Sequence, residues 1–151
     1  MEFVTLNNGI KMPLEGFGVF QVPDSTECEK AVLEAIETGY RLIDTAAAYG
    51  NEEAVGAAIK KCGVPRDELF ITTKLWVQDA SYNGAKRALE TSLKKLGTDY
   101  LDLYLIHQPM GVHTVLWKKN IKSVGFVQSV FAISIPKDFA ISAKPLKLCL
   151  W

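Results

Sequence analysis

Four polar residues, Asp44, Tyr49, Lys74 and His107, lie at or just beyond the ends of short apolar runs in the sequence. Each run is rich in branched residues, a pattern typical of a buried strand. Tyrosine has an ordinary pKa of about 10, so it is a useful acid only where a nearby cation stabilises the phenolate. Lys74 is such a cation, and Asp44 would balance its charge in a partly desolvated site.

Together these side chains predict a site for proton transfer. His107 would hydrogen-bond and orient a polar atom of a substrate. The group suits proton donation to a developing alkoxide, which is the chemistry of carbonyl reduction. The sequence has only two histidines and no Gly-x-Ser-x-Gly segment, so neither a metal site nor an activated serine is predicted.

The segments that would position these residues alternate between strands and helices. A hairpin is expected near the N-terminus, because Asn-Asn-Gly separates two short apolar runs. Helical spacing of apolar residues indicates three helices, the first two capped by Asp24-Ser25 and Asn51 and all three ending at a glycine. Strands are predicted over residues 14–20, 41–46, 69–74 and 101–107.

This alternation implies parallel strands joined by right-handed crossovers, in either an open doubly wound sheet or a closed barrel. An open sheet with a dinucleotide site would usually show Gly-x-Gly-x-x-Gly, but Gly16-Phe-Gly18 is followed by Val-Phe-Gln. A barrel binds ligands at the C-terminal ends of its strands, where the polar residues stand. Because eight units take about 250 residues, the predicted fold is α/β, an incomplete TIM-type (β/α)8 barrel of about four βα units after an N-terminal β-hairpin.

The composition is that of an ordinary globular protein. The formal net charge is zero and 48% of the residues are hydrophobic, which argues against disorder and against a nucleic-acid partner. No apolar run approaches the roughly 18–20 residues that span a bilayer, and the N-terminus lacks a basic start, so a cytoplasmic location without a membrane partner is expected. Cys28, Cys62 and Cys149 have no metal-like spacing and are interpreted as reduced packing residues.

Five segments resemble, in order, the strand-end signatures of the aldo-keto reductases. They are LEGFGVF at 14–20, GYRLIDTA at 39–46, AYGNEE at 48–53, FITTKLW at 70–76 and DYLDLYLIHQP at 99–109. The resemblance covers residues 1 to about 110, the N-terminal half of that family's barrel. It implies an oxidoreductase that uses NADPH to reduce a small-molecule aldehyde or ketone to an alcohol.

The resemblance also implies a role for each matching residue. Tyr49 would be the proton donor, Lys74 would favour its ionisation, Asp44 would partner Lys74, and His107 would orient the carbonyl. The implied cofactor-binding residues are Gly18, Val19, Phe20 and Asp44, and the implied substrate-binding residues are Phe20, Trp76 and His107.

The tail departs from the family pattern, so the chain is divided into residues 1–110, the half barrel, and residues 111–151, a divergent tail. The tail carries six lysines and one acidic residue, Asp138. Val127-Gln128 stands where the resemblance implies a Ser-Asn pair that holds the nicotinamide amide, and Asp138 lies where a 2′-phosphate would bind, so NADPH binding is in question. A shifted reading frame or a rearranged gene is our hypothesis for the tail.

Three functions therefore remain open for the chain. The first is a carbonyl reductase. The second is a truncated, catalytically inactive reductase fragment or a non-catalytic binding module, and the third, ranked last, is a regulatory subunit of a membrane assembly. An incomplete barrel would leave its first and fourth strands as open edges, which predicts self-association or cover by the tail.

Overall fold

The computed structural model describes residues 1–6 and 8–108, together with the backbone of residues 131–133 and 148–150. The chain begins with the predicted hairpin: β1 (Phe3–Thr5) pairs antiparallel with β2 (Lys11–Pro13). At the turn, Gly9 has a φ of +85°, a conformation that favours glycine. The Asn8 side chain accepts a hydrogen bond from the Ile10 amide at 3.1 Å, which further fixes the turn.

Four parallel strands form the centre of the structure. They are β3 (Gly16–Gly18), β4 (Leu42–Asp44), β5 (Phe70–Leu75) and β6 (Leu103–Ile106), and they lie side by side in sequence order. The predicted parallel arrangement is confirmed. The first two strands have three residues each, fewer than the segments predicted for them, because the flanking residues turn away toward the site or the helices.

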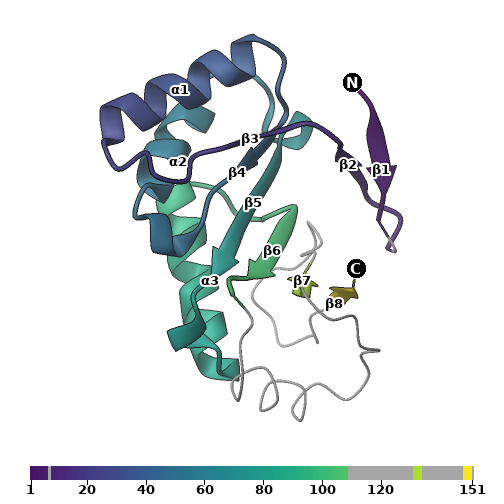
Figure 1. Ribbon diagram of the computed structural model, residues 1–151, viewed down its shortest axis with the longest axis vertical. Helices are drawn as coiled ribbons and strands as arrows, with labels where there is room; N and C mark the ends of the chain where they lie inside the picture. The colour runs from purple at the N-terminus through teal and green to yellow at the C-terminus, as the bar shows by residue number, and fades with distance from the viewer. Residues whose placement is uncertain (7, 109–130, 134–147, 151) are drawn as a thin grey trace.

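Three helices cover one face of this sheet, as Figure 1 shows. They are α1 (Ser25–Glu37), α2 (Glu52–Lys61) and α3 (Tyr82–Leu96). Asp24 caps α1 as predicted, because its side chain accepts a hydrogen bond from the Glu27 amide at 2.8 Å. Gly97 ends α3 with a φ of +66°.

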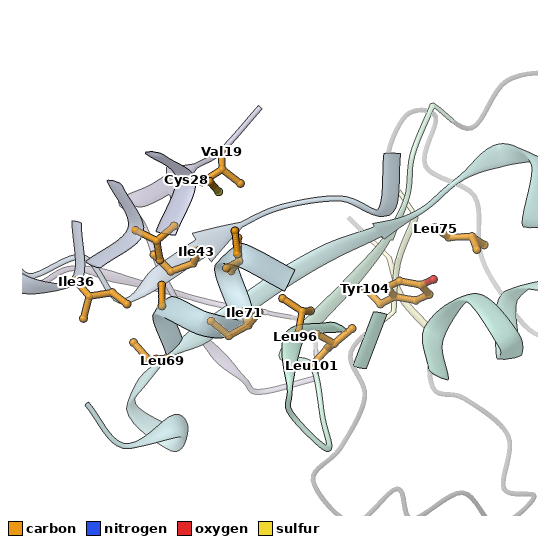
Figure 2. Packing of buried hydrophobic residues seen from close by; sticks show 14 of the residues in the cluster. Val19, Cys28, Ile36, Ile43, Leu69, Ile71, Leu75, Leu96, Leu101 and Tyr104 are labelled. Carbon is orange, nitrogen blue, oxygen red and sulfur yellow. The ribbon is translucent and has the colours of Figure 1, made fainter. Parts of the chain in front are cut away.

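The main core lies between the sheet and the helices (Figure 2). Alternate strand residues point toward the helices and meet an apolar stripe from each one. Each fully buried Val, Leu or Ile contributes about 1.5–3 kcal/mol to folding. The buried strand residues are Ile43, Ile71, Leu75, Tyr104 and Ile106, and the helix residues packed against them include Cys28, Val32, Ile36, Val55, Ala58 and Leu96.

A smaller core lies on the other face, under the hairpin. Leu6, Phe70 and Leu103 are buried there, and Val4 and Met12 of the hairpin pack against them. Figure 1 shows the hairpin, in purple, on the side of the sheet away from the helices. The hairpin thus covers the N-terminal ends of β5 and β6 and leaves their C-terminal ends to the polar residues.

The fourth parallel strand is not an open edge, because a segment of the tail covers it, which is one of the two expected outcomes. β7 (Phe131–Ile133) pairs antiparallel with β6, and β8 (Leu148–Leu150) pairs antiparallel with β7. Unpaired N–H and C=O groups of an edge strand are ready partners for another segment, whatever its direction. Val127-Gln128 and Asp138 lie outside the described residues, and the proposed boundary near residue 110 stays a prediction.

Asp102 is a structural group, as the contacts of its carboxylate show. Its Oδ2 accepts a hydrogen bond from the Ile71 amide at 2.9 Å and lies 2.9 Å from the Arg66 guanidinium. Arg66 also donates to the Thr98 hydroxyl and to the carbonyls of Leu69 and Tyr100. This cluster ties the start of β5 to the start of β6.

Cys28 is buried and Cys62 half-buried, and both are free thiols. No helix in the described part of the chain combines the length and the apolar character needed to cross a bilayer.

Gly56 offers a test of how closely α2 packs on α3. A Cβ at this position would lie 2.6 Å from the Lys95 carbonyl oxygen and 2.7 Å from that of Leu96. Alanine is favoured over glycine in a free helix by about 1 kcal/mol, but overpacking costs about 1–3 kcal/mol. We therefore expect Gly56→Ala to lower the free energy of unfolding, as measured by urea denaturation with circular dichroism.

The matched control is Lys60→Ala, an exposed change on the same helix, which should alter the free energy of unfolding by no more than about 0.5 kcal/mol. A Gly56→Ala protein more stable than the wild type would show that the two helices do not make this close contact.

Candidate active site

Three strands and one short helix carry the four predicted catalytic residues to the same edge of the sheet. Asp44 is the last residue of β4, Lys74 is the second-last residue of β5, and His107 directly follows β6. The side chains of Asp44 and Lys74 point away from the helices, because their sequence neighbours Ile43 and Leu75 face the helical core and side chains alternate along a strand. Tyr49 ends a 3-10 helix (Ala47–Tyr49) that follows β4.

Lys74 is the centre of the polar group. Its ammonium Nζ donates to Asp44 Oδ2 at 2.6 Å and to the Thr45 carbonyl at 2.9 Å. The third contact of Nζ is a long hydrogen bond of 3.5 Å to the Tyr49 hydroxyl. The Lys74 side chain is only 14% exposed, so its charge is held in place by charge-assisted hydrogen bonds rather than by water. The structure thus brings Asp44, Tyr49 and Lys74 into direct contact.

Aromatic rings surround Tyr49. The Phe20 ring lies 5.0 Å from the Tyr49 ring, centroid to centroid, and the His107 ring lies 5.6 Å away nearly at a right angle. The indole of Trp76 packs edge-on against His107 at 5.3 Å. Phe20 is 64% exposed despite its size. The predicted substrate residues Phe20 and His107 therefore flank the Tyr49 ring, and Trp76 lies beside His107.

The predicted cofactor residues come from β3 and the turn after it. Gly18 pairs with Asp44 in the sheet, and the Val19 amide donates to the Asp44 carbonyl at 3.1 Å. The Val19 side chain is fully buried in the helical core, so it is not presented to a ligand. The exposed Phe20 ring and the open backbone at Gly18 suit a flat, partly apolar ring.

The electrostatic environment of His107 favours its neutral form. Burial lowers the pKa of His107 below its ordinary value of 6.5, the Lys74 charge lowers it further, and the Asp44 carboxylate partly opposes both effects. The ring nitrogen Nδ1 is buried and has no hydrogen-bond partner within the described residues. A neutral imidazole can donate one hydrogen bond and accept another, which suits it to orient a polar substrate atom.

Asn51 has the predicted cap position but not the predicted role of its side chain. It stands directly before α2, where a cap was predicted, but its side chain makes no capping hydrogen bond. The carboxamide instead contacts Thr45 and the turn after β3. Its backbone partners there, Val19 and Val22, lie 32 and 29 residues away in the sequence, so no local pattern distinguishes this role from capping.

Parallel strands, helices outside them and a polar site at the strands' C-terminal ends together define this chain as part of a TIM-barrel protein. A comparison with family models finds that of the aldo/keto reductase family over residues 16–132. The chain belongs to the aldo/keto reductase family, and the predicted resemblance and barrel type are confirmed.

Curated relatives agree with this assignment. An aldo-keto reductase of Mycolicibacterium vanbaalenii is 51% identical over 132 residues, covering 84% of this chain and 47% of the relative. The glyoxal reductase of Bacillus subtilis is 55% identical over 106 residues, covering 70% of this chain and 38% of the relative. The chain thus spans less than half the length of these relatives.

Solved structures show the same fold. An aldo/keto reductase from Brucella melitensis matches with a TM-score of 0.72 and 48% identity, over 79% of this chain and 47% of that one. A Bombyx mori aldo-keto reductase in complex with NADP matches with a TM-score of 0.68 and 45% identity, over 72% of this chain and 38% of that one.

The charges around His107 lead to a prediction about its titration. We expect the pKa of His107, followed by histidine ring signals in NMR, to lie below 6.5. Lys74→Met should raise this pKa and Asp44→Asn should lower it, because each removes one of the two opposing charges. Since folding lowers this pKa, the stability linked to His107 is present above the unfolded value and is lost as the pH falls through the folded value.

His107→Gln identifies the signal, since the sequence holds only two histidines. Lys60→Ala, which removes an exposed lysine from α2, should leave the titration unchanged. A His107 that titrates at or above 6.5, or that shifts equally in the Lys74 and Lys60 variants, would contradict this account.

Proposed function

We propose that this chain carries the catalytic group of a carbonyl reductase, which uses NADPH to reduce an aldehyde or ketone to an alcohol with Tyr49 as proton donor. The observation that carries the proposal is the Lys74 ammonium, held by Asp44 and Thr45 and in contact with the Tyr49 hydroxyl. A surface lysine would be solvated, whereas this one is directed at a phenol. Family membership supports an oxidoreductase.

The reaction follows from what each side chain can do. Bound NADPH, held by Gly18, Val19, Phe20 and Asp44, would supply the hydride. Neutral His107 orients the carbonyl oxygen through a hydrogen bond. Tyr49 gives its hydroxyl proton to that oxygen as it becomes an alkoxide, and the Lys74 ammonium stabilises the phenolate that remains. Asp44 holds Lys74 in place throughout.

The relatives support two finer parts of the proposal. The Bombyx mori structure is a complex with NADP, and this supports NADP(H) as the cofactor. The Bacillus subtilis relative is named glyoxal reductase, which supports a small carbonyl compound as the substrate. The exposed Phe20 ring beside Tyr49 and the half-buried Trp76 ring beside His107 are compatible with an apolar part of such a substrate. A cytoplasmic location and self-association stay predictions.

A second candidate is the inactive fragment or non-catalytic binding module. Its support is that the chain spans 38–47% of the relatives it matches. Residues from the remaining part of a barrel would complete both the cofactor and the substrate site. Under this proposal the polar group is inherited intact but has no cofactor to work with.

Tyr49→Phe separates the two candidates. Phenylalanine keeps the ring that packs on Phe20 and removes the proton, so turnover of NADPH with an aldehyde panel should fall by about 10²- to 10⁴-fold. NADPH binding, measured by nucleotide fluorescence, should be retained. Tyr82→Phe is the matched control, because the Tyr82 ring is 71% exposed, and it should leave both binding and turnover unchanged.

Full turnover in Tyr49→Phe would overturn the assignment of Tyr49 as proton donor. A folded wild-type chain that neither binds NADPH nor oxidises it with any aldehyde would favour the inactive fragment.

A further inference from the structure

The carboxamide of Asn51 joins the turn that carries Phe20 to Thr45, which contacts the catalytic group. Asn51 is 1% exposed. Its Nδ2 group donates to the Val19 carbonyl at 2.9 Å and to the Val22 carbonyl at 3.1 Å, and its Oδ1 accepts from the Thr45 hydroxyl at 2.8 Å. Both amide protons are therefore used, as a buried polar group requires.

The donor side of Asn51 holds the turn that presents Phe20. The turn runs from Val19 to Val22, and its own closing hydrogen bond, from the Val22 amide to the Val19 carbonyl, is long at 3.4 Å. Gln21 within it has a φ of +61°, which costs a residue with a side chain about 1–2 kcal/mol. A turn with a weak closing bond and an unfavourable backbone needs outside support, and the Asn51 amide contacts both of its ends.

The acceptor side of Asn51 holds Thr45, which contacts the catalytic group. The Thr45 hydroxyl donates to Asn51, while the Thr45 carbonyl accepts from the Lys74 ammonium at 2.9 Å. Thr45 is fully buried. Rotation or displacement of Thr45 would move one of the two groups that anchor Lys74 beside Tyr49.

We propose that Asn51 is a positioning residue with two separable effects. Its amide protons hold the turn that places Phe20, and its oxygen holds Thr45, whose carbonyl positions Lys74. The inference rests on the proposed function, because Phe20 and Lys74 have meaning as substrate and proton-transfer groups only in that reaction. It adds a residue that contacts neither the substrate nor the phenol. Loss of the donor side should weaken substrate binding, and loss of the acceptor side should slow the chemical step.

Two substitutions remove one side each. Asn51→Asp keeps an oxygen that can accept from Thr45 but replaces the amide protons with an oxygen facing the Val19 and Val22 carbonyls. Thr45→Val removes the hydroxyl while keeping a similar shape, and it leaves both amide protons in place. Asn83→Asp, the same chemical change at an exposed position of α3, is the matched control.

The first readout needs neither cofactor nor turnover. In protein with ¹³C-labelled tyrosine, the Tyr49 ring signal, assigned with Tyr49→Phe, reports the ring current of Phe20. Asn51→Asp should shift this signal toward its position in Phe20→Ala, whereas Thr45→Val and Asn83→Asp should not. A Tyr49 signal that is unchanged in folded Asn51→Asp would overturn the inference.

The second readout is steady-state kinetics with NADPH and the best aldehyde. We expect Asn51→Asp to raise KM about tenfold with kcat little changed, and Thr45→Val to lower kcat about tenfold with KM little changed. If both variants instead change kcat and KM to the same extent, the cause would be general destabilisation, and the assignment of separate effects to the two sides of Asn51 would be overturned. If the wild type shows no turnover, the proposed function fails, while the ring-current test still decides the position of Phe20.

Asn51→Asp places a carboxylate in a buried site, so its fold is checked by circular dichroism. If it does not fold, Asn51→Ala replaces it, and the effect of the donor side is the difference between Asn51→Ala and Thr45→Val. A shift of the Tyr49 signal in Asn51→Ala but not in Thr45→Val supports the inference, and identical signals in the two variants overturn it.

Discussion

A partly buried ammonium needs partners, and this requirement at Lys74 organises the site. Removing a lysine charge from water is costly unless oxygen atoms surround it. Here the oxygens come from Asp44, the Thr45 backbone and the Tyr49 hydroxyl. Those groups can meet Lys74 only if β4 and β5 are adjacent, parallel and in the observed register. The same strand arrangement that gives the Lys74 ammonium its oxygen partners therefore also places the Tyr49 hydroxyl beside it.

The division of the sheet into two faces follows from simple alternation. Residues facing the helices are aliphatic and build the main core. Residues on the other face change along each strand, from apolar side chains under the hairpin to polar ones at the C-terminal ends. In β5 this change takes place within one strand, from Phe70 to Lys74. One short strand thus contributes to folding at its start and to the site at its end.

Much of this arrangement could be predicted from the sequence, because it depends on local patterns. The helical spacing, the Asp24 cap and the order of strands are all encoded within short segments, and strand ends in a barrel indicate where polar groups converge. Asn51 could not be predicted, because a cap residue and a long-range hydrogen-bonding residue look alike in sequence. Cover of the strand edge by the tail was among the expectations, but the pairing of β7 with β6 was not predicted, since antiparallel pairing with a distant segment leaves no periodic signal.

The contacts of Asp102 affect a part of the site far from Asp102 itself. Its carboxylate accepts from the Ile71 amide, while its own amide donates to the Ile71 carbonyl at 3.2 Å. These two hydrogen bonds fix the register of β6 against β5 at the start of their pairing. A slip of β6 by one residue would carry His107 about 3.3 Å along the sheet and turn its ring to the opposite face. The position of the His107 imidazole relative to Tyr49 is thus set at the other end of β6, by the Asp102 carboxylate, which lies away from the site.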